Sequence, residues 1–311
     1  MSRPTWARLR LAAGAAILLV LVWRLGTGPF LHGVRTVDTT ALVLGSLIAV
    51  PTTLCCAWRW RLVARALDVG VSLPAATGAY YRSQFLNTVL PGGVLGDVHR
   101  GLRHGREVAD TAGSLRSVAW ERGVGQVVQL AVAAVVLLLL PSPARAHVPK
   151  VVVALVVVGL VVAILARRHA GVLGADLRVL LARRTWPALL VVSALALVGH
   201  VLTFLVAARA AGAHASTTQL VPLAMVVLLA MGIPANVAGW GPREGVAACA
   251  FAAAGLGAQL GLTIAVVYGV MVLVAGLPGL VVLVVEGGRA RRTAPAVAIP
   301  VPLPVRGVLR G

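Results

Sequence analysis

The sequence predicts an all-α polytopic membrane protein with about eight helical spans, and three observations support that prediction. Hydrophobic residues make up 59% of the 311 residues and charged residues only 12%, which is too little polar surface for a soluble protein of this size. Several segments run for about 18 residues or more without a charge, long enough to cross roughly 30 Å of hydrocarbon as helices. The basic residues also concentrate on one side of the predicted spans.

The apolar runs place the spans at about residues 9–26, 38–57, 117–140, 148–166, 186–208, 219–238, 245–259 and 261–285. The seventh is short for a crossing on its own. We expect residues 1–286 to form one transmembrane domain. Residues 287–311 are rich in Pro and Arg and are expected to be a disordered cytoplasmic tail.

The distribution of basic residues predicts the orientation. With the N-terminus inside, the inner loops hold 21 of the 28 Lys and Arg residues, the outer loops hold five, and Arg82 and Arg243 fall in irregular regions. This asymmetry predicts a plasma-membrane protein with both termini in the cytoplasm. The net charge of +19 is then explained by topology and by anionic lipid, so we expect no nucleic-acid partner.

Residues 71–96 are weakly apolar and lie between two basic segments that both score as inside. The region must therefore enter and leave by the same face, either as a re-entrant segment or as two short crossing helices. Its polar residues, such as Tyr80, Arg82 and Gln84, would be costly against lipid. Irregular backbone at membrane depth is tolerated only inside protein or beside a wet cavity, which makes this region the first candidate for function.

The first polar motif is "LPGGVLGDVHR", which ends at Arg100. Pro91, Gly92 and Gly96 are expected to interrupt a helix. Asp97 would then N-cap a new helix and share a face with Arg100 at i, i+3. A helix N-terminus among glycines suits a phosphate group. The alternative is a capped amphipathic helix whose arginines simply face the cytoplasm.

Two further polar motifs interrupt apolar runs. Glu121 and Arg122 open "SVAWERGVGQVVQL", where a polar stripe should face the interior of the bundle; the alternative is an interfacial charge pair. "PANVAGWGPREG" contains Gly241 and the adjacent pair Arg243 and Glu244. It is either a helix broken within the membrane or a cytoplasmic turn. Two interrupted segments, one in each half of the chain, are what an inverted repeat would produce.

No cofactor or metal site is expected from the sequence. Cys55, Cys56 and Cys249 show no metal-ligand spacing and are interpreted as small packing residues. His200 lies in the middle of a predicted span, where we expect it to make a hydrogen bond inside the bundle. No nucleotide-binding motif is present, so any transport would be driven by a gradient, a partner or mass action.

Together, "FLNTVLPGGVLGDVHRGLRHGR", "SVAWERGVGQVVQL" and "GIPANVAGWGPREGVAACAF" resemble, in this order, segments of the flippase-like, or lysylphosphatidylglycerol synthase transmembrane-region, family. The resemblance implies about eight helical elements with re-entrant segments. In some members this region moves an aminoacylated or glycosylated lipid between leaflets. Carried over position by position, it implies substrate-binding roles for Asn87, Pro91, Gly92, Gly96, Asp97, Arg100, Glu121, Arg122, Gly241 and Glu244.

The resemblance also guides the functional expectation. Family members with synthase activity carry a large soluble C-terminal domain, whereas this sequence stops after a short tail, so we expect a short member without synthase activity. The leading hypothesis is a translocase for an anionic or modified lipid or a lipid-linked sugar. Arg100, Arg122 and Arg243 would hold the headgroup.

Two alternatives come from other functional classes. An intramembrane aspartyl enzyme would need two carboxylates sharing a site, and no second Asp accompanies Asp97 in the predicted membrane region. A non-catalytic partner of a cell-envelope glycosyltransferase or lipid-modifying enzyme is compatible with the sequence.

Overall fold

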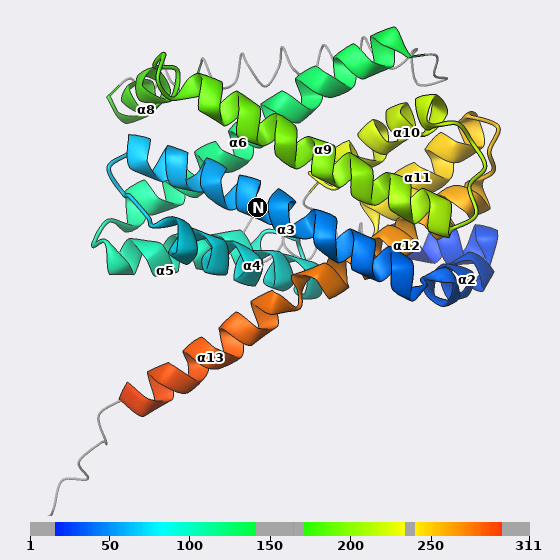
Figure 1. Ribbon diagram of the computed structural model, residues 1–311, viewed down its shortest axis with the longest axis horizontal. Helices are drawn as coiled ribbons and strands as arrows, with labels where there is room; N and C mark the ends of the chain where they lie inside the picture. Colours follow the sequence, from blue (N-terminus) through cyan, green and yellow to red (C-terminus); the bar gives the residue numbers. More distant parts are fainter. Residues whose placement is uncertain (1–15, 141–163, 165–170, 234–239, 294–311) are drawn as a thin grey trace, which may run out of the picture.

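The computed structural model describes residues 16–140, 164, 171–233 and 240–293 (Figure 1). Within these residues every regular element is a helix and there is no strand, which confirms the all-α class. Beyond the helical segment Ala16–Leu25, the elements are α2 (Gly28–Thr36), α3 (Thr39–Ala66), α4 (Leu73–Val89), α5 (Leu95–Glu107), α6 (Thr111–Leu139), α8 (Val172–Leu180), α9 (Trp186–Ala210), α10 (Thr217–Ala230), α11 (Pro242–Ala253), α12 (Ala258–Gly276) and α13 (Pro278–Thr293).

Four helical segments in the described residues are long and apolar enough to cross a membrane: α3, α6, α9 and the run Ala258–Glu286, which joins α12 to most of α13. Ala16–Leu25 and α2 make a fifth span if they are counted together, although the chain bends by 95° between them. Gly26 allows this bend through its positive φ of 73°. The eight predicted spans are therefore not confirmed.

The difference in number has physical causes. The segments predicted at 219–238 and 245–259 are the short helices α10 and α11, of 14 and 12 residues, each too short to cross on its own. Almost all of the predicted span 148–166 lies outside the described residues, as do residues 234–239 and 294–311. Helix α13 continues to Thr293, past the predicted boundary at residue 286.

Two spans begin or end well away from their predicted limits. Helix α3 was expected to end near residue 57 but continues to Ala66, which places Arg59 inside a helix rather than in a loop. Helix α6 was expected to begin near residue 117 but starts at Thr111, because Asp110 caps it by accepting a hydrogen bond from the Gly113 N–H at 2.8 Å. Glu121 consequently lies well inside α6 instead of opening a span.

Region 71–96 forms the helix α4 and the first turn of α5, separated by a turn at residues 90–94. Gly92 and Gly93 have φ values of 91° and 64° there, a conformation that favours glycine. Asp97 was expected to be the N-cap of the second helix, but α5 begins at Leu95 and Asp97 lies in its first turn. Its side chain is thereby free to bind other elements.

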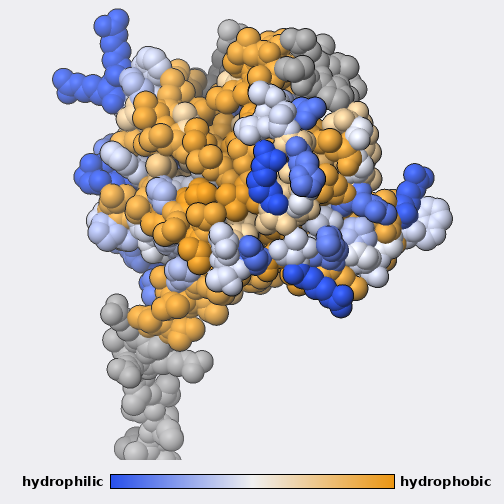
Figure 2. Space-filling view, turned by 45° about the vertical axis from the view of Figure 1, so that its right-hand side comes forward, coloured by the Kyte–Doolittle hydropathy of each residue, from blue (hydrophilic) through white to orange (hydrophobic). Residues whose placement is uncertain are grey.

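The packing around α3 positions the polar region. Helices α3 and α9 run side by side in opposite directions (Figure 1). One apolar core, which includes Phe204, Phe251 and Tyr268, joins α9 to α12; a second, which includes Trp60 and Tyr80, joins α3, α4 and α6. Outside, apolar side chains cover much of the face shown in Figure 2, as expected of a surface against lipid.

Candidate functional site

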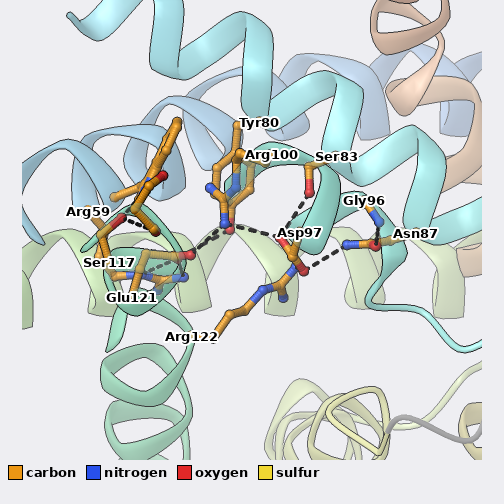
Figure 3. Close-up of polar contacts among 12 residues, drawn as sticks. Arg59, Tyr80, Ser83, Asn87, Gly96, Asp97, Arg100, Ser117, Glu121 and Arg122 are labelled. Carbon is orange, nitrogen blue, oxygen red and sulfur yellow. Dashed lines mark hydrogen bonds and ion pairs between the residues drawn. The ribbon is translucent and has the colours of Figure 1, made fainter. Parts of the chain in front are cut away.

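A network of charged side chains, all buried except that of Arg122, lies where α3, α4, α5 and α6 meet (Figure 3). Its five charged members come from three helices: Arg59 from α3, Asp97 and Arg100 from α5, and Glu121 and Arg122 from α6. We call these five residues the inner network. Charged side chains buried inside the bundle require partners, because burying an isolated ion in a low-dielectric interior costs several kcal/mol.

Glu121 is the fully buried centre of the inner network, with 0% of its surface exposed. Its Oε1 accepts hydrogen bonds from Arg59 Nε at 2.8 Å and Nη2 at 2.5 Å, and from the Tyr80 hydroxyl at 3.3 Å. Its Oε2 accepts one from Arg100 Nη2 at 3.0 Å. Two guanidinium groups therefore neutralise one carboxylate through charge-assisted hydrogen bonds.

Asp97 is the second carboxylate of the inner network. Its Oδ1 accepts from the Ser83 hydroxyl at 2.9 Å and from Arg100 Nη2 at 3.0 Å. Its Oδ2 accepts from Asn87 Nδ2 at 2.9 Å and from Arg122 Nη2 at 2.5 Å. Burial alone would raise the pKa of this carboxyl, but the two guanidinium groups and the two neutral donors outweigh burial and hold the pKa below its usual value.

Arg100 joins the two carboxylates through a single nitrogen, Nη2, and only 1% of its surface is exposed. Its guanidinium carbon lies 4.5 Å from the ring centre of Trp60 and 4.4 Å from that of Tyr80. Nε and Nη1 have no hydrogen-bond partner among the described residues. The two aromatic faces stabilise the cation in place of further hydrogen bonds.

The close contact between α4 and α5 positions Asp97 through Asn87 on α4 and Gly96 on α5. The side-chain oxygen of Asn87 accepts a hydrogen bond from the Gly96 N–H at 2.8 Å, while its nitrogen donates to Asp97. A β-carbon on Gly96 would lie 2.1 Å from the Ser83 carbonyl oxygen, so only glycine permits this approach. The N–H of Gly96, at the helix N-terminus where a phosphate was considered, is thus already occupied.

Six of the predicted site residues come together in this way: Asn87, Gly96, Asp97, Arg100, Glu121 and Arg122. Pro91 and Gly92 lie in the turn before α5 and contribute backbone shape. Asp97 and Arg100 form the i, i+3 pair that the spacing predicted.

Gly241, Arg243 and Glu244 lie together at the start of α11, where Arg243 and Glu244 form an ion pair. Glu244 accepts from the Gly241 N–H at 2.7 Å and from Arg243 Nε at 2.8 Å. The Arg243 guanidinium lies 5.6 Å from the ring centre of Tyr268. No ion pair links this pair to the inner network within the described residues. The Tyr268 hydroxyl lies 3.5 Å from His200 Nδ1, which fits the predicted contact inside the bundle.

The inner network carries three positive and two negative charges, so it has a net charge of +1. Four of its side chains are at most 9% exposed, whereas the Arg122 side chain is 47% exposed. A ligand approaching the network would therefore meet Arg122 first. Among the described residues, no group of three or more His, Cys, Asp or Glu side chains is placed to hold a metal ion.

Sequence reasoning missed Arg59, Trp60 and Ser83 as members of this region. Arg59 was assigned to a cytoplasmic loop because the predicted span ended too early. Ser83 was detectable, because Tyr80, Ser83 and Asn87 follow the i, i+3, i+7 spacing of one helical face. Trp60 had no such signal: it lies beside Arg100 only because α3 and α5 meet in the fold.

The comparison with protein families agrees with this architecture. A family model described as lysylphosphatidylglycerol synthase TM region matches residues 7–279. The chain belongs to this family. Together with the long apolar helices, this match supports a multi-pass membrane protein, and the matched residues contain both the inner network and the Arg243–Glu244 pair. No curated protein matches the chain.

Proposed function

We propose that this protein is a translocase that moves a lipid, or a lipid-linked sugar, with an anionic headgroup between the membrane leaflets. The observation that supports it is the inner network: a buried cluster with one excess positive charge and one accessible arginine, Arg122. A headgroup with one negative charge would balance the cluster. Charged residues at membrane depth usually mark a substrate path.

We further propose that the site binds rather than catalyses. Each carboxylate of the inner network is held by two guanidinium groups: Glu121 by Arg59 and Arg100, and Asp97 by Arg100 and Arg122. A carboxylate held in this way is a weak base, because proton uptake would break both ion pairs. The α4–α5 turn offers a place where the two helices could separate to let a headgroup pass.

The test is lipid scrambling in liposomes that contain the purified protein, with headgroup access read by a membrane-impermeant reagent. Lipids from a total envelope extract serve as substrates. We expect the wild type to scramble an anionic lipid and Arg122→Gln to lose at least about tenfold in rate, since it removes a charge-assisted contact. Because the Arg122 side chain is 47% exposed, this variant should keep its fold.

The matched control is Arg178→Gln, which removes an exposed arginine on α8. It should scramble like the wild type. If the wild type moves no extract lipid, the translocase proposal is wrong, and the alternative of a non-catalytic partner for a cell-envelope glycosyltransferase or lipid-modifying enzyme becomes the better one. If Arg122→Gln scrambles normally, the inner network is not the path.

The proposed location is the plasma membrane, with the α5 side of the bundle in the cytoplasm. Two exposed arginines test it, Arg35 on α2 and Arg106 on α5, each changed to cysteine after the three native cysteines are replaced. A membrane-impermeant maleimide should label Arg35→Cys in intact cells and Arg106→Cys only after permeabilisation. The reverse pattern would overturn the orientation predicted from the basic residues.

A further inference from the structure

A second charged cluster lies where α4, α5 and α13 meet. It consists of Arg82 on α4, Arg103 on α5 and Glu286 on α13, and we call it the outer cluster. Nη1 of Arg82 and Nη1 of Arg103 both donate to the same atom, Oε2 of Glu286. Glu286 also lies beyond the residues that match the family, which end at 279.

The outer cluster has more donors than Glu286 satisfies, although Nε of Arg103 also donates to Glu107 Oε1 on the same helix at 3.3 Å. Arg82 is 3% exposed, and its Nε is buried without a hydrogen-bond partner among the described residues. Burial and then the guanidinium groups of Arg82 and Arg103 lower the pKa of the nearby His99, consistent with a positive local field. A phosphate group offers more acceptor oxygens than a carboxylate and pairs well with guanidinium forks.

The outer cluster is open at one side. The Arg103 side chain is 39% exposed and that of Glu286 is 27% exposed, whereas that of Arg82 lies beneath them at 3%. An anion from outside could therefore replace Glu286 on Arg103 first and then reach the spare N–H of Arg82. Binding of the anion to Arg103 and then to Arg82 would leave the ion pairs of the inner network intact.

The surroundings of the outer cluster indicate that the anion is attached to a lipid. Exposed apolar side chains flank the cluster on both helices that reach the surface: Leu95, Val98 and Leu102 on α5, and Val281, Val284 and Val285 on α13. Arginines beside an apolar surface suit a phosphate headgroup whose acyl chains lie against the protein. A free phosphate ion would gain nothing from these apolar residues.

We propose that the junction of α4, α5 and α13 binds the phosphodiester of an anionic membrane lipid, which displaces Glu286 from Arg82 and Arg103. Glu286 is then an internal competitor that occupies the site when no lipid is bound. This proposal does not depend on translocation, since it concerns a site that shares no residue with the inner network.

The test counts lipids bound to the purified full chain by native mass spectrometry, with phosphatidylglycerol and phosphatidylcholine of matched acyl chains. The wild type should retain phosphatidylglycerol in preference to phosphatidylcholine. Glu286→Gln should raise phosphatidylglycerol retention about three- to tenfold, because it removes the competing charge, and Arg103→Gln should lower it by a similar factor. Both substituted side chains are partly exposed, so both variants should fold.

The opposite changes in phosphatidylglycerol retention expected of Glu286→Gln and Arg103→Gln distinguish a binding site from a structural ion pair. If Glu286 only held α13 in place, Glu286→Gln would leave retention unchanged or lower it, and the proposal would fail. Arg178→Gln, the exposed arginine on α8, controls for general attraction and should match the wild type. Displacement of phosphatidylglycerol by soluble glycerol phosphate, blocked by Arg103→Gln, would instead assign the site to a free phosphate ester and overturn the lipid assignment.

Discussion

Replacing Glu121 with glutamine should destabilise the protein by about 3–5 kcal/mol, the cost of removing one partner from a buried ion pair. Glutamine keeps the shape of the side chain but not its charge. Arg59 and Arg100, whose side chains are 9% and 0% exposed, would then lose the carboxylate that both of them share. In detergent, the thermal unfolding midpoint should fall by roughly 10 °C.

A second substitution separates the charge effect from loss of packing. Arg59→Gln added to Glu121→Gln restores the net charge of the inner network to +1, so the double variant should be more stable than Glu121→Gln alone. Glu107→Gln is the matched control, because the Glu107 side chain is 58% exposed and, among the described residues, its ion pairs are with neighbours on α5. It should change stability by less than about 0.5 kcal/mol.

Two outcomes would contradict this account of Glu121. Equal stability of Glu121→Gln and the wild type would mean that water or a bound ion already compensates the arginines. A double variant less stable than Glu121→Gln would mean that Arg59 contributes mainly through packing of its side chain. Either result would remove the electrostatic basis for the inner network.

The scarcity of acidic residues explains why much of the site was predictable. With nine Asp and Glu residues in the chain, those in or near apolar segments stand out, and Asp97 and Glu121 do share one arginine, Arg100. Local spacing also predicted the Asp97–Arg100 pair. The pairing of Arg59 with Glu121 spans 62 residues, and no local pattern encodes which helices meet.

The limits of the helices were less predictable than their existence. A hydropathy window ends a span at the first charge, so it ended the second span before Arg59, although α3 continues to Ala66. Arg59 is accommodated inside that helix by its ion pair with Glu121. Hydropathy also predicted full spans for the short helices α10 and α11, since apolar content does not reveal where a helix breaks.

The hypothesis of paired halves was only partly informative. A polar pair lies in each half of the chain, at Asp97 with Arg100 and at Arg243 with Glu244. The hypothesis of an inverted repeat stays a prediction, because residues 234–239 of the second interruption lie outside the described residues. It did not predict that the second pair would be satisfied locally, by the Gly241 N–H and by the neighbouring residue. Short-range partners of this kind satisfy a buried charge without requiring contact between the halves.

Replacing Gly96 with alanine should have the second large effect, because it separates the helices that position Asp97. The added β-carbon would lie 2.1 Å from the Ser83 carbonyl oxygen and 2.8 Å from Asn87 Oδ1. A clash with backbone cannot be relieved by a side-chain rotation, so we expect a loss of about 3 kcal/mol, the upper part of the range for overpacking. Thermal unfolding in detergent measures this loss.

Gly78 supplies the matched control on α4, since a β-carbon there would meet nothing within 4 Å. Gly78→Ala should stabilise the helix by up to about 1 kcal/mol, because alanine is the better helix former. If Gly96→Ala is as stable as Gly78→Ala, then α4 and α5 do not approach as closely as described. If Gly96→Ala unfolds earlier but scrambles lipid normally, the α4–α5 contact supports the fold without positioning Asp97 for transport. If Gly96→Ala loses both stability and scrambling, the α4–α5 contact also supports the inner network. The new methyl group would displace Ser83 and Asn87, which are the neutral donors to Asp97.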